Sequence, residues 1–247
     1  GLFENSYFLP PSDDSGIPLG CAWFAYQELI DIEEKEMFSP YIGKSYSRAE
    51  IITTINDFPN LKFNEYDNME DLIEDTSYWL TQNRVIGWFQ GGSEIGPRAL
   101  GNRSILASPI NSWITGHINS DIKKREWYRP FAPAVLFERQ GDVFESDVYS
   151  PYMLVTTTVK EEWRTKIPAV THIDNSARHQ SVTETNNPNF FKLIKSFYDK
   201  TGVPVLLNTS FNGPKEPIVE TPTDAIRSFY ETGLDFLVIG NFIVSKN

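Results

Sequence analysis

Several kinds of residue are scarce in this chain of 247 residues, and each shortage excludes a class of protein. Its single cysteine, Cys21, cannot form an internal disulfide, so a disulfide-stapled secreted scaffold is excluded. Its three histidines, His117, His172 and His179, share no metal-ligand spacing, so a histidine-based metal centre is not predicted. No apolar run approaches the roughly 20 residues that span a bilayer, which argues against a transmembrane segment.

The start of the chain lacks an initiator methionine and the basic and apolar stretches of a signal peptide. Together with the single cysteine, this favours a reducing compartment, and a cytoplasmic location is expected. A chain that opens in this way is expected to be one part of a longer or two-chain protein. Cys21 falls in an apolar helical stretch, where a buried and unreactive thiol is expected.

Basic residues are outnumbered: 22 Lys and Arg stand against 33 Asp and Glu, for a net charge of −11. Such a surface repels phosphate backbones and anionic lipids, so neither nucleic acid nor a membrane is an expected partner. The basic residues that exist concentrate between positions 98 and 129. They are Arg98, Arg103, Lys123, Lys124, Arg125 and Arg129. A basic cluster in an acidic protein predicts a pocket for a small anion.

Apolar residues are plentiful, and their periodicity predicts helices and strands that intermix without strict alternation. The expected fold class is therefore α/β, or α+β, with a mixed sheet. The expected helices cover 19–32, 69–82, 112–124, 189–200 and 223–231. The expected strands cover 84–89, 130–137, 152–159 and 203–207, and a hairpin covers 236–244. Residues 31–68 are acidic and lack a sustained period, so they are expected to form a connection.

Three segments could carry chemistry, and each also has a plain structural explanation. Glycine N–H groups in 91–104, with Arg98 and Arg103, could converge on an anion, or the segment could be a turn with its arginines solvated or paired to Glu94. Residues 123–130 could bind an anion or form a solvated charge run at a helix end. The polar residues 208–212 follow a buried strand and could bind a nucleotide or form an Asx turn.

Isolated candidates carry the same ambiguity. Arg178 stands alone in its segment, and by itself it is better explained by a surface ion pair. Asp13 and Asp14 lie in a turn, so ordinary turn chemistry competes with a metal or phosphate role.

Read together, four blocks in order resemble the carbamoyltransferase family, which includes nodulation-factor and antibiotic O-carbamoyltransferases. The blocks are Gly96–Leu106, Lys123–Pro133, Ile167–His172 and Leu207–Asn212. The resemblance covers about residues 84–247. In addition, 14–16 and 19–22 are similar to the end of the family's amino-terminal domain.

The resemblance implies a two-domain enzyme of which this chain is the carboxy-terminal part. Residues 69–247 would form a domain similar to the YrdC-like fold of threonylcarbamoyl-adenylate synthases, with a mixed twisted sheet. Residues 46–68 would connect it to residues 1–45, the tail of an actin/hexokinase-like domain. A partner is therefore implied, either the missing amino-terminal domain or a separate chain, and a homodimer is left open.

The implied reaction forms carbamoyl adenylate from carbamoyl phosphate and ATP, with Mg²⁺ accompanying the nucleotide. The other domain would pass the carbamoyl group to a hydroxyl of a small-molecule acceptor with a divalent metal such as Fe²⁺. Both first substrates are polyanions that repel each other, so fixed cations are needed to bring them together.

The resemblance also implies roles for named residues. The residues assigned to catalysis and to carbamoyl phosphate are Lys123, Arg129 and Arg178. The residues assigned to ATP are Arg98, Arg103, Arg125, Asn208, Ser210 and Asn212. Asp14 matches a metal ligand whose histidine partners this chain does not contain.

Two other functions stay open. The chain could be a non-catalytic module that holds nucleotide or carbamoyl phosphate and completes an interface with an amino-terminal chain. It could also be a threonylcarbamoyl-adenylate synthase-like enzyme, against which the net charge and the carbamoyltransferase-type blocks argue.

Overall fold

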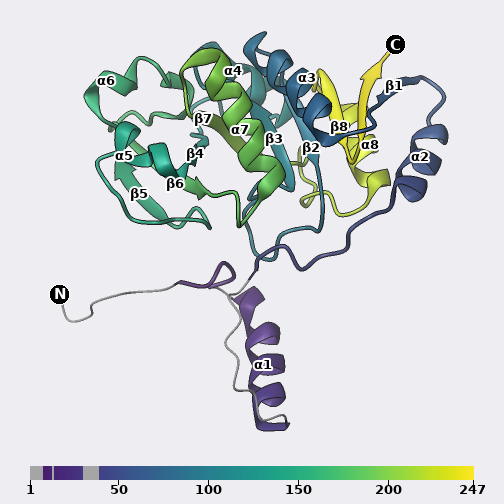
Figure 1. Ribbon diagram of the computed structural model, residues 1–247, viewed down its shortest axis with the longest axis horizontal. Helices are drawn as coiled ribbons and strands as arrows, with labels where there is room; N and C mark the ends of the chain where they lie inside the picture. The colour runs from purple at the N-terminus through teal and green to yellow at the C-terminus, as the bar shows by residue number, and fades with distance from the viewer. Residues whose placement is uncertain (1–7, 13, 30–38) are drawn as a thin grey trace.

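A mixed sheet runs through the centre of the protein (Figure 1), in a computed structural model that describes residues 8–12, 14–29 and 39–247. Within these residues nine strands pair in the order β1-β9-β8-β2-β3-β7-β4-β6-β5. Two neighbouring pairs, β2 with β8 and β4 with β6, are parallel, and the other pairs are antiparallel. The strands are β1 (Leu61–Glu65), β2 (Ile86–Phe89), β3 (Arg103–Ala107), β4 (Ala132–Leu136), β5 (Val155–Thr158), β6 (Ser176–Val182), β7 (Val205–Ser210), β8 (Phe236–Ile239) and β9 (Phe242–Lys246). The predicted mixed α/β class is thereby confirmed.

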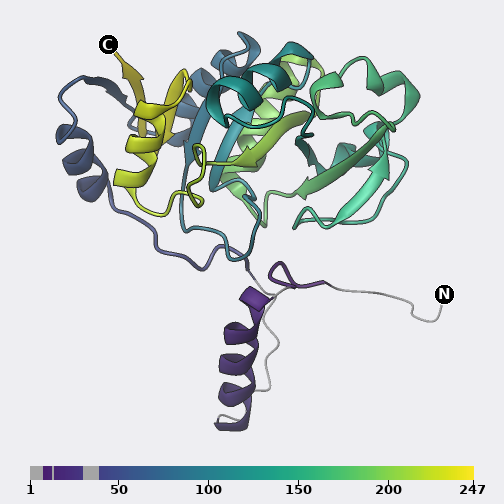
Figure 2. The same cartoon turned by 180° about the vertical axis from the view of Figure 1, so that it is seen from behind.

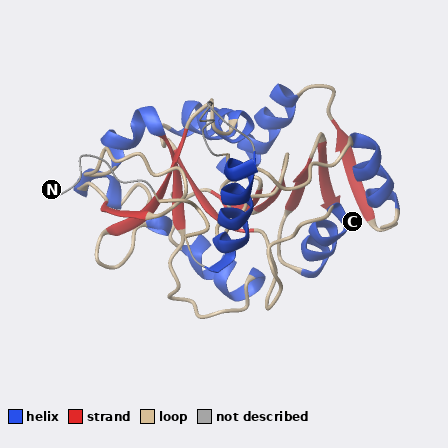
Figure 3. Ribbon diagram, turned by 90° about the horizontal axis from the view of Figure 1, so that it is seen from below, coloured by secondary structure: helices blue, strands red, loops and turns tan. Residues whose placement is uncertain are grey.

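Helices cover both faces of this sheet (Figure 3). Helices α3 and α7 lie on the face toward the viewer in Figure 1, whereas α4 and α8 lie on the face seen in Figure 2. The α-helices of the described residues are α1 (Ile17–Leu29), α2 (Arg48–Asn56), α3 (Met69–Thr81), α4 (Trp113–His117), α5 (Gln140–Val143), α6 (Glu161–Arg164), α7 (Pro188–Thr201) and α8 (Pro222–Glu231). No helix among them is both long enough and apolar enough to cross a membrane.

Helix α7 illustrates how the sequence builds these layers. The side chain of Asn187 accepts a hydrogen bond from the Phe190 amide and begins the helix, and Gly202 ends it with a left-handed φ of 72°. Helical spacing buries Leu193 and Phe197 against the sheet, and each such burial contributes about 1.5–3 kcal/mol. The predicted helix 189–200 is confirmed.

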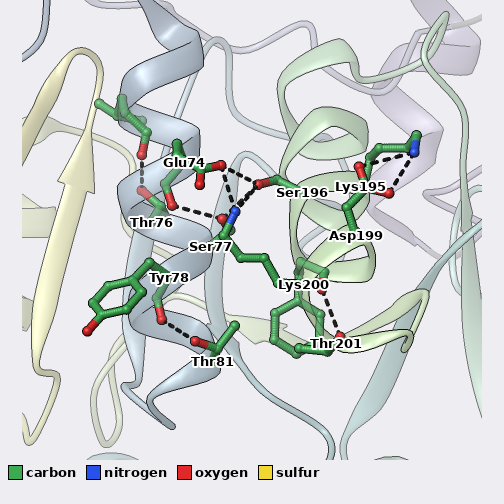
Figure 4. A network of polar contacts seen from close by, with 12 residues as sticks. Glu74, Thr76, Ser77, Tyr78, Thr81, Lys195, Ser196, Asp199, Lys200 and Thr201 are labelled. Carbon is green, nitrogen blue, oxygen red and sulfur yellow. Dashed lines mark hydrogen bonds and ion pairs between the residues drawn. The ribbon is translucent and has the colours of Figure 1, made fainter.

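Polar contacts on the outer side join α7 to α3 (Figure 4). Lys200 forms an ion pair with Glu74 at 2.6 Å, and the hydroxyls of Ser77 and Ser196 are hydrogen-bonded at 2.7 Å. Because the exposed ion pair is worth at most about 1 kcal/mol, these contacts align two helices that apolar burial already holds.

The segment 46–68, predicted to be an irregular connection, contains α2 and β1. The Ser47 hydroxyl caps the Glu50 amide and Glu50 caps the Ser47 amide, which starts α2. Strand β1 pairs with β9 at the edge of the sheet. Most of its side chains are exposed, and its apolar alternation is limited to Leu61 and Phe63, which is too short to predict a strand. The division into domains at residues 45 and 69 stays a prediction.

Other differences from the prediction have local causes. Strands β3 and β6 were not expected, and β6 is composed largely of polar residues that are nevertheless buried, such as His179, Gln180 and Ser181. The expected helix 112–124 forms only as α4 followed by a π-helical turn at Ile118–Ile122. Tertiary burial and hydrogen bonding thus override the local pattern.

Helix α1 projects away from the sheet (Figures 1 and 2), and none of its residues is buried. Cys21 is therefore exposed, and the prediction of a buried thiol is wrong because nothing in the described part of the chain packs over it. Residues 30–32 of the expected helix 19–32 lie outside the described residues, as does Asp13. The actin-like origin of this region stays a prediction.

Candidate functional site

Two adjoining cavities collect most of the predicted site residues. The first, of about 340 Å³, is here named the arginine cavity. Its lining comprises Arg98, Arg125, Arg129, Arg178, Pro97, Ala99, Pro130, Phe131, Ala132, Met153, Asn208, Thr209 and Ser210. The second, of about 660 Å³, is named the lysine cavity. Its lining comprises Lys123, Lys124, Lys215, Arg125, Arg129, Ser210, Asn212, Gly213 and Pro214. Arg125, Arg129 and Ser210 belong to both.

Strand register brings the arginine cavity together from distant parts of the sequence. Asn208 of β7 lies opposite Ala132 of β4. On the other side of β4, Ala134 lies opposite Gln180 of β6, which runs parallel. Arg178, two residues before Gln180, therefore reaches the same end of the sheet as Ala132, with its side chain on the same face as that of Gln180.

Lys123 is buried, with 6% of its surface exposed, and its ammonium group is enclosed by oxygens. Its Nζ lies 2.5 Å from the Ser210 carbonyl and 3.2 Å from the Ser210 Oγ. It also lies 3.0 Å from the Asn212 carbonyl and 2.5 Å from the Asn212 Oδ1. Burial, together with the charge of Arg125, lowers the pKa of Lys123 from 10.5 to about 7. The Lys-x-Arg and Ser-x-Asn segments predicted to act together are thus in direct contact.

The π-helical turn delivers Lys123 to this position. The Lys123 amide donates to the Ile118 carbonyl, five residues earlier, at 2.9 Å. Buried Asn119 in the same turn donates to the carbonyls of Trp127 and Arg129 and accepts from the Arg125 Nε at 2.7 Å. Such turns occur frequently at functional sites. Sequence reasoning missed Asn119, because a single Asn in an expected helix carries no signal.

The cations of the arginine cavity have few internal partners. The buried Nε atoms of Arg98 and Arg178 have no hydrogen-bond partner, and neither side chain forms an ion pair with a described residue. The closest ion pair at this cavity joins Arg129 to Glu126 at 3.9 Å on the exposed rim. Burial and the neighbouring Arg98 lower the pKa of Arg178, although a guanidinium stays charged. Uncompensated positive charge of this kind suits an anionic ligand.

The glycine-rich loop behaves differently from the prediction. Its N–H groups do converge on an anion, but the anion is the carboxylate of Glu94. Glu94 Oε1 accepts from the amides of Leu100, Asn102 and Arg103 at 2.8, 2.6 and 3.2 Å. These amides therefore do not need an external phosphate.

Arg103, assigned to ATP from the sequence, lines neither cavity. It is fully buried, and its guanidinium donates to four backbone carbonyls and stacks over Phe89 at 3.6 Å. The carbonyls belong to Lys44, Gln90, Gly91 and Asn102. The structure therefore places Arg103 apart from the other candidates, as a residue that fixes the loop.

The remaining candidates are placed as follows. Asn208 lines the arginine cavity and donates to Gln180 Oε1 at 2.9 Å. Asp14 is exposed in a short 3₁₀ turn, and the described residues contain no group of three or more His, Cys, Asp or Glu that could hold a metal. Its assignment as a metal ligand stays a prediction.

The two cavities group the cations differently from the predicted assignment. Arg178, assigned to carbamoyl phosphate, shares a cavity with Arg98, which was assigned to ATP. Lys123 shares the other cavity with Asn212.

A third cavity, of about 720 Å³, is larger than these two. Aromatic residues such as Tyr41, Tyr149 and Tyr152 line it together with amides and hydroxyls, and none of its lining residues is charged. It cannot offset the repulsion between polyanions, so size alone does not make it the candidate site.

Similarity to known proteins points to one family. Residues 77–246 match the family model described as "Carbamoyltransferase C-terminus". The chain is 39% identical to nodulation protein NolNO of Sinorhizobium fredii, over 100% of this chain and 37% of that protein. It is 36% identical to 3'-hydroxymethylcephem-O-carbamoyltransferase of Amycolatopsis lactamdurans, over 98% of this chain and 44% of that protein. The chain thus spans less than half the length of these curated relatives.

Among solved structures, full-length HypF in a phosphate- and nucleotide-bound form is similar with a TM-score of 0.48 and 16% identity. The match covers 72% of this chain and 22% of that one. The family model, which matches residues 77–246 and so most of the chain, establishes the family. The chain belongs to the carbamoyltransferase family, whose carboxy-terminal region it represents.

Proposed function

We propose that this chain forms carbamoyl adenylate from carbamoyl phosphate and ATP, as the activating part of an O-carbamoyltransferase. One water is consumed for the atoms to balance. The P–O link of carbamoyl phosphate is hydrolysed to give carbamate and phosphate. A carbamate oxygen then attacks the α-phosphorus of ATP, the bond to the β-phosphate breaks, and pyrophosphate leaves.

The observation that supports this reaction most strongly is the pair of cationic cavities that share Arg125, Arg129 and Ser210. Two polyanions must come close for the reaction, and their repulsion needs to be offset by charges already in position. Arg98 and Arg178 supply such charges without internal ion pairs. The shared residues lie where the two reactants would meet.

The local chemistry suggests a role for each cavity. The smaller arginine cavity suits carbamoyl phosphate, because planar guanidinium groups can make bidentate phosphate contacts. The lysine cavity, larger and lined by Lys123, Lys124 and Lys215, suits the phosphates of ATP and the departing pyrophosphate. An anion beside Lys123 would raise its pKa and keep it protonated.

Mg²⁺ would enter with the nucleotide and neutralise part of its charge. The transfer of the carbamoyl group to an acceptor hydroxyl is proposed for the part of the longer relatives that this chain does not cover. A divalent metal there, with Asp14 as one ligand, belongs to the same proposal. No step described for this chain depends on that metal.

The reaction is tested by incubating the chain with ATP, Mg²⁺ and carbamoyl phosphate and following pyrophosphate release. Release that requires carbamoyl phosphate supports the proposal. Binding of both anions without release would instead favour a non-catalytic module that needs its amino-terminal partner. Release with L-threonine and bicarbonate in place of carbamoyl phosphate would favour a threonylcarbamoyl-adenylate synthase-like activity.

A further inference from the structure

We propose that Glu94 is a positioning residue for Arg98, because its carboxylate fills the N–H nest of the glycine-rich loop and leaves Arg98 as the group that the loop offers to a ligand. The inference rests on the proposed function in one respect, that Arg98 binds an anion. It goes further by assigning a role to a residue that contacts neither cavity.

The nest consists of the backbone amides of Leu100, Asn102 and Arg103, and the conformation of the loop creates it. Gly96 and Gly101 have φ values of 103° and 107°, which L-residues with a side chain rarely adopt. These conformations let the amides of Leu100, Asn102 and Arg103 point at one oxygen of Glu94. A nest of this kind binds a phosphate or carboxylate wherever one is available. Here the protein supplies the carboxylate itself.

A complementary clamp acts on the carbonyl side of the same loop. The Arg103 guanidinium donates to the carbonyls of Gln90 and Gly91 at 2.7 and 3.1 Å and to that of Asn102 at 3.0 Å. Residues 90–103 are thus held through their N–H groups by an internal anion and through their C=O groups by an internal cation. Arg98 lies between these two anchors, so its backbone is fixed before any ligand arrives.

The nest also keeps Glu94 from neutralising Arg98. The two residues are four apart in sequence and of opposite charge, a combination that often forms an ion pair. No such pair is present among the described residues, and Glu94 Oε1 instead accepts hydrogen bonds from three amides. Arg98 therefore keeps a buried Nε without a partner and its full charge for the arginine cavity.

The test is a double-mutant cycle read by calorimetric titration with ATP and, separately, with carbamoyl phosphate. Arg98→Ala is expected to weaken binding of at least one of them about 10-fold, the scale of a charge-assisted hydrogen bond. Glu94→Ala is expected to weaken the same binding about 5-fold or more. In the Arg98→Ala background, Glu94→Ala should have an effect of less than about 2-fold, because contacts that act through one residue are not additive.

Controls separate positioning from general loss of structure. Glu50→Gln removes a carboxylate that also accepts a backbone amide, from Ser47 at 2.8 Å, but lines no cavity. It should leave anion binding unchanged even if the melting temperature falls. Glu94→Gln, which retains an acceptor oxygen, should restore most of the affinity lost in Glu94→Ala. If Glu94→Ala does not fold, Glu94→Asp, which withdraws the carboxylate by one methylene, takes its place in the cycle.

The outcomes distinguish this inference from the proposed function. If Arg98→Ala leaves both titrations unchanged, the assigned role of Arg98 fails, and the inference fails with it. If Arg98→Ala weakens binding but the Glu94 substitution lowers the affinity by the same factor in the wild-type and the Arg98→Ala proteins, the inference alone is overturned. In that case Glu94 stabilises the fold without acting through Arg98.

Discussion

The glycine-rich loop and the loop that follows β7 are each organised around a charged side chain of the protein, but the two charges are opposite. In the first, backbone N–H groups enclose the carboxylate of Glu94. In the second, the carbonyl and side-chain oxygens of Ser210 and Asn212 enclose the ammonium of Lys123. Each loop is fixed by an ion that belongs to the protein, so its shape does not depend on a bound ligand.

The difference between the loops lies in what the enclosed ion can still do. The described structure places Glu94 away from both cavities, whereas Lys123 lines the lysine cavity. Lys123 can therefore exchange some of its oxygen contacts for a ligand phosphate, and Glu94 cannot. The comparison predicts that changes in the glycine-rich loop act mainly on stability and on Arg98, while changes at Lys123 act on the reaction itself.

The largest effect is expected at Arg103. Arg103→Met would remove the donor of the Lys44, Gln90 and Gly91 carbonyls, whereas the Asn102 carbonyl keeps the Gln90 amide, and each buried acceptor left without a partner costs about 1–3 kcal/mol. Chemical denaturation should show this loss as a lower free energy of unfolding. Arg139→Met, at an exposed site with one surface ion pair, is the control and should change it by less than about 1 kcal/mol. An Arg103 variant as stable as the wild type would show that the glycine-rich loop is not fixed by its internal charged groups.

The second effect is expected at Lys123. Lys123→Met should reduce carbamoyl phosphate-dependent pyrophosphate release by about 10²-fold, the scale of a lost preorganised donor. Lys124→Met, a change at the exposed neighbour on the same cavity, should reduce it by much less because Lys124 makes no comparable set of contacts. Equal losses in the two variants would show that the cavity responds to total charge and that the oxygen cage around Lys123 has no special role.

A smaller effect is expected at Asn119, which links the π-helical turn to Arg125 and to the backbone before Pro130. Asn119→Ala should destabilise the protein by about 1–3 kcal/mol, since it leaves buried polar groups unsatisfied. It should also raise the KM of the reaction, because Arg125 loses its positioning contact. Asn111→Ala, which removes a side-chain contact to Asn83, is the control and should leave KM unchanged.

The smallest predicted effect is a proton uptake by Lys123 that depends on pH. The pKa of Lys123 is about 7 in the fold and about 10.5 when unfolded, so the cost of burying its charge is full below pH 7. That cost is relieved as the pH rises, and stability is gained between about pH 7 and 10. When an anion that raises this pKa binds at pH 8, Lys123 should therefore take up between about half and one proton. Calorimetry of pyrophosphate binding in buffers of different protonation enthalpy measures this uptake, and Lys123→Met should abolish it.

Several features of the fold could be predicted because their signals are local. The amphipathic periodicity of α7 and its Pro and Gly boundaries identify that helix from its own residues. By contrast, β6 is made largely of polar residues, and only the hydrogen bonds of Gln180 and Ser181 inside the protein explain their burial. Strand β1 depends on its pairing with β9, which lies far away in the sequence.

The candidate site shows the same limit. Charge clustering predicted an anion pocket near residues 98–129, and the resemblance pointed to Lys123-x-Arg125 and Ser210-x-Asn212 as parts of one nucleotide site. The structure brings Lys123 and Ser210 into contact. The separation of Arg103 from Arg98 could not be foreseen, because two arginines five residues apart look equivalent in sequence. Only the path of the backbone decides which one enters a cavity and which one is enclosed by carbonyls.

Because the segment Ile118–Ile122 forms a π-helical turn, the number of residues in it matters as much as their identity. It accommodates one residue more than an α-helical turn, and each residue advances a helix by about 100°. Deleting a single residue there would restore an α-helical turn and rotate the following ammonium group out of its oxygen cage. Homologous proteins and engineered variants should accordingly tolerate exchanges of the exposed side chains Ser120 and Asp121 far more readily than any insertion or deletion in this turn.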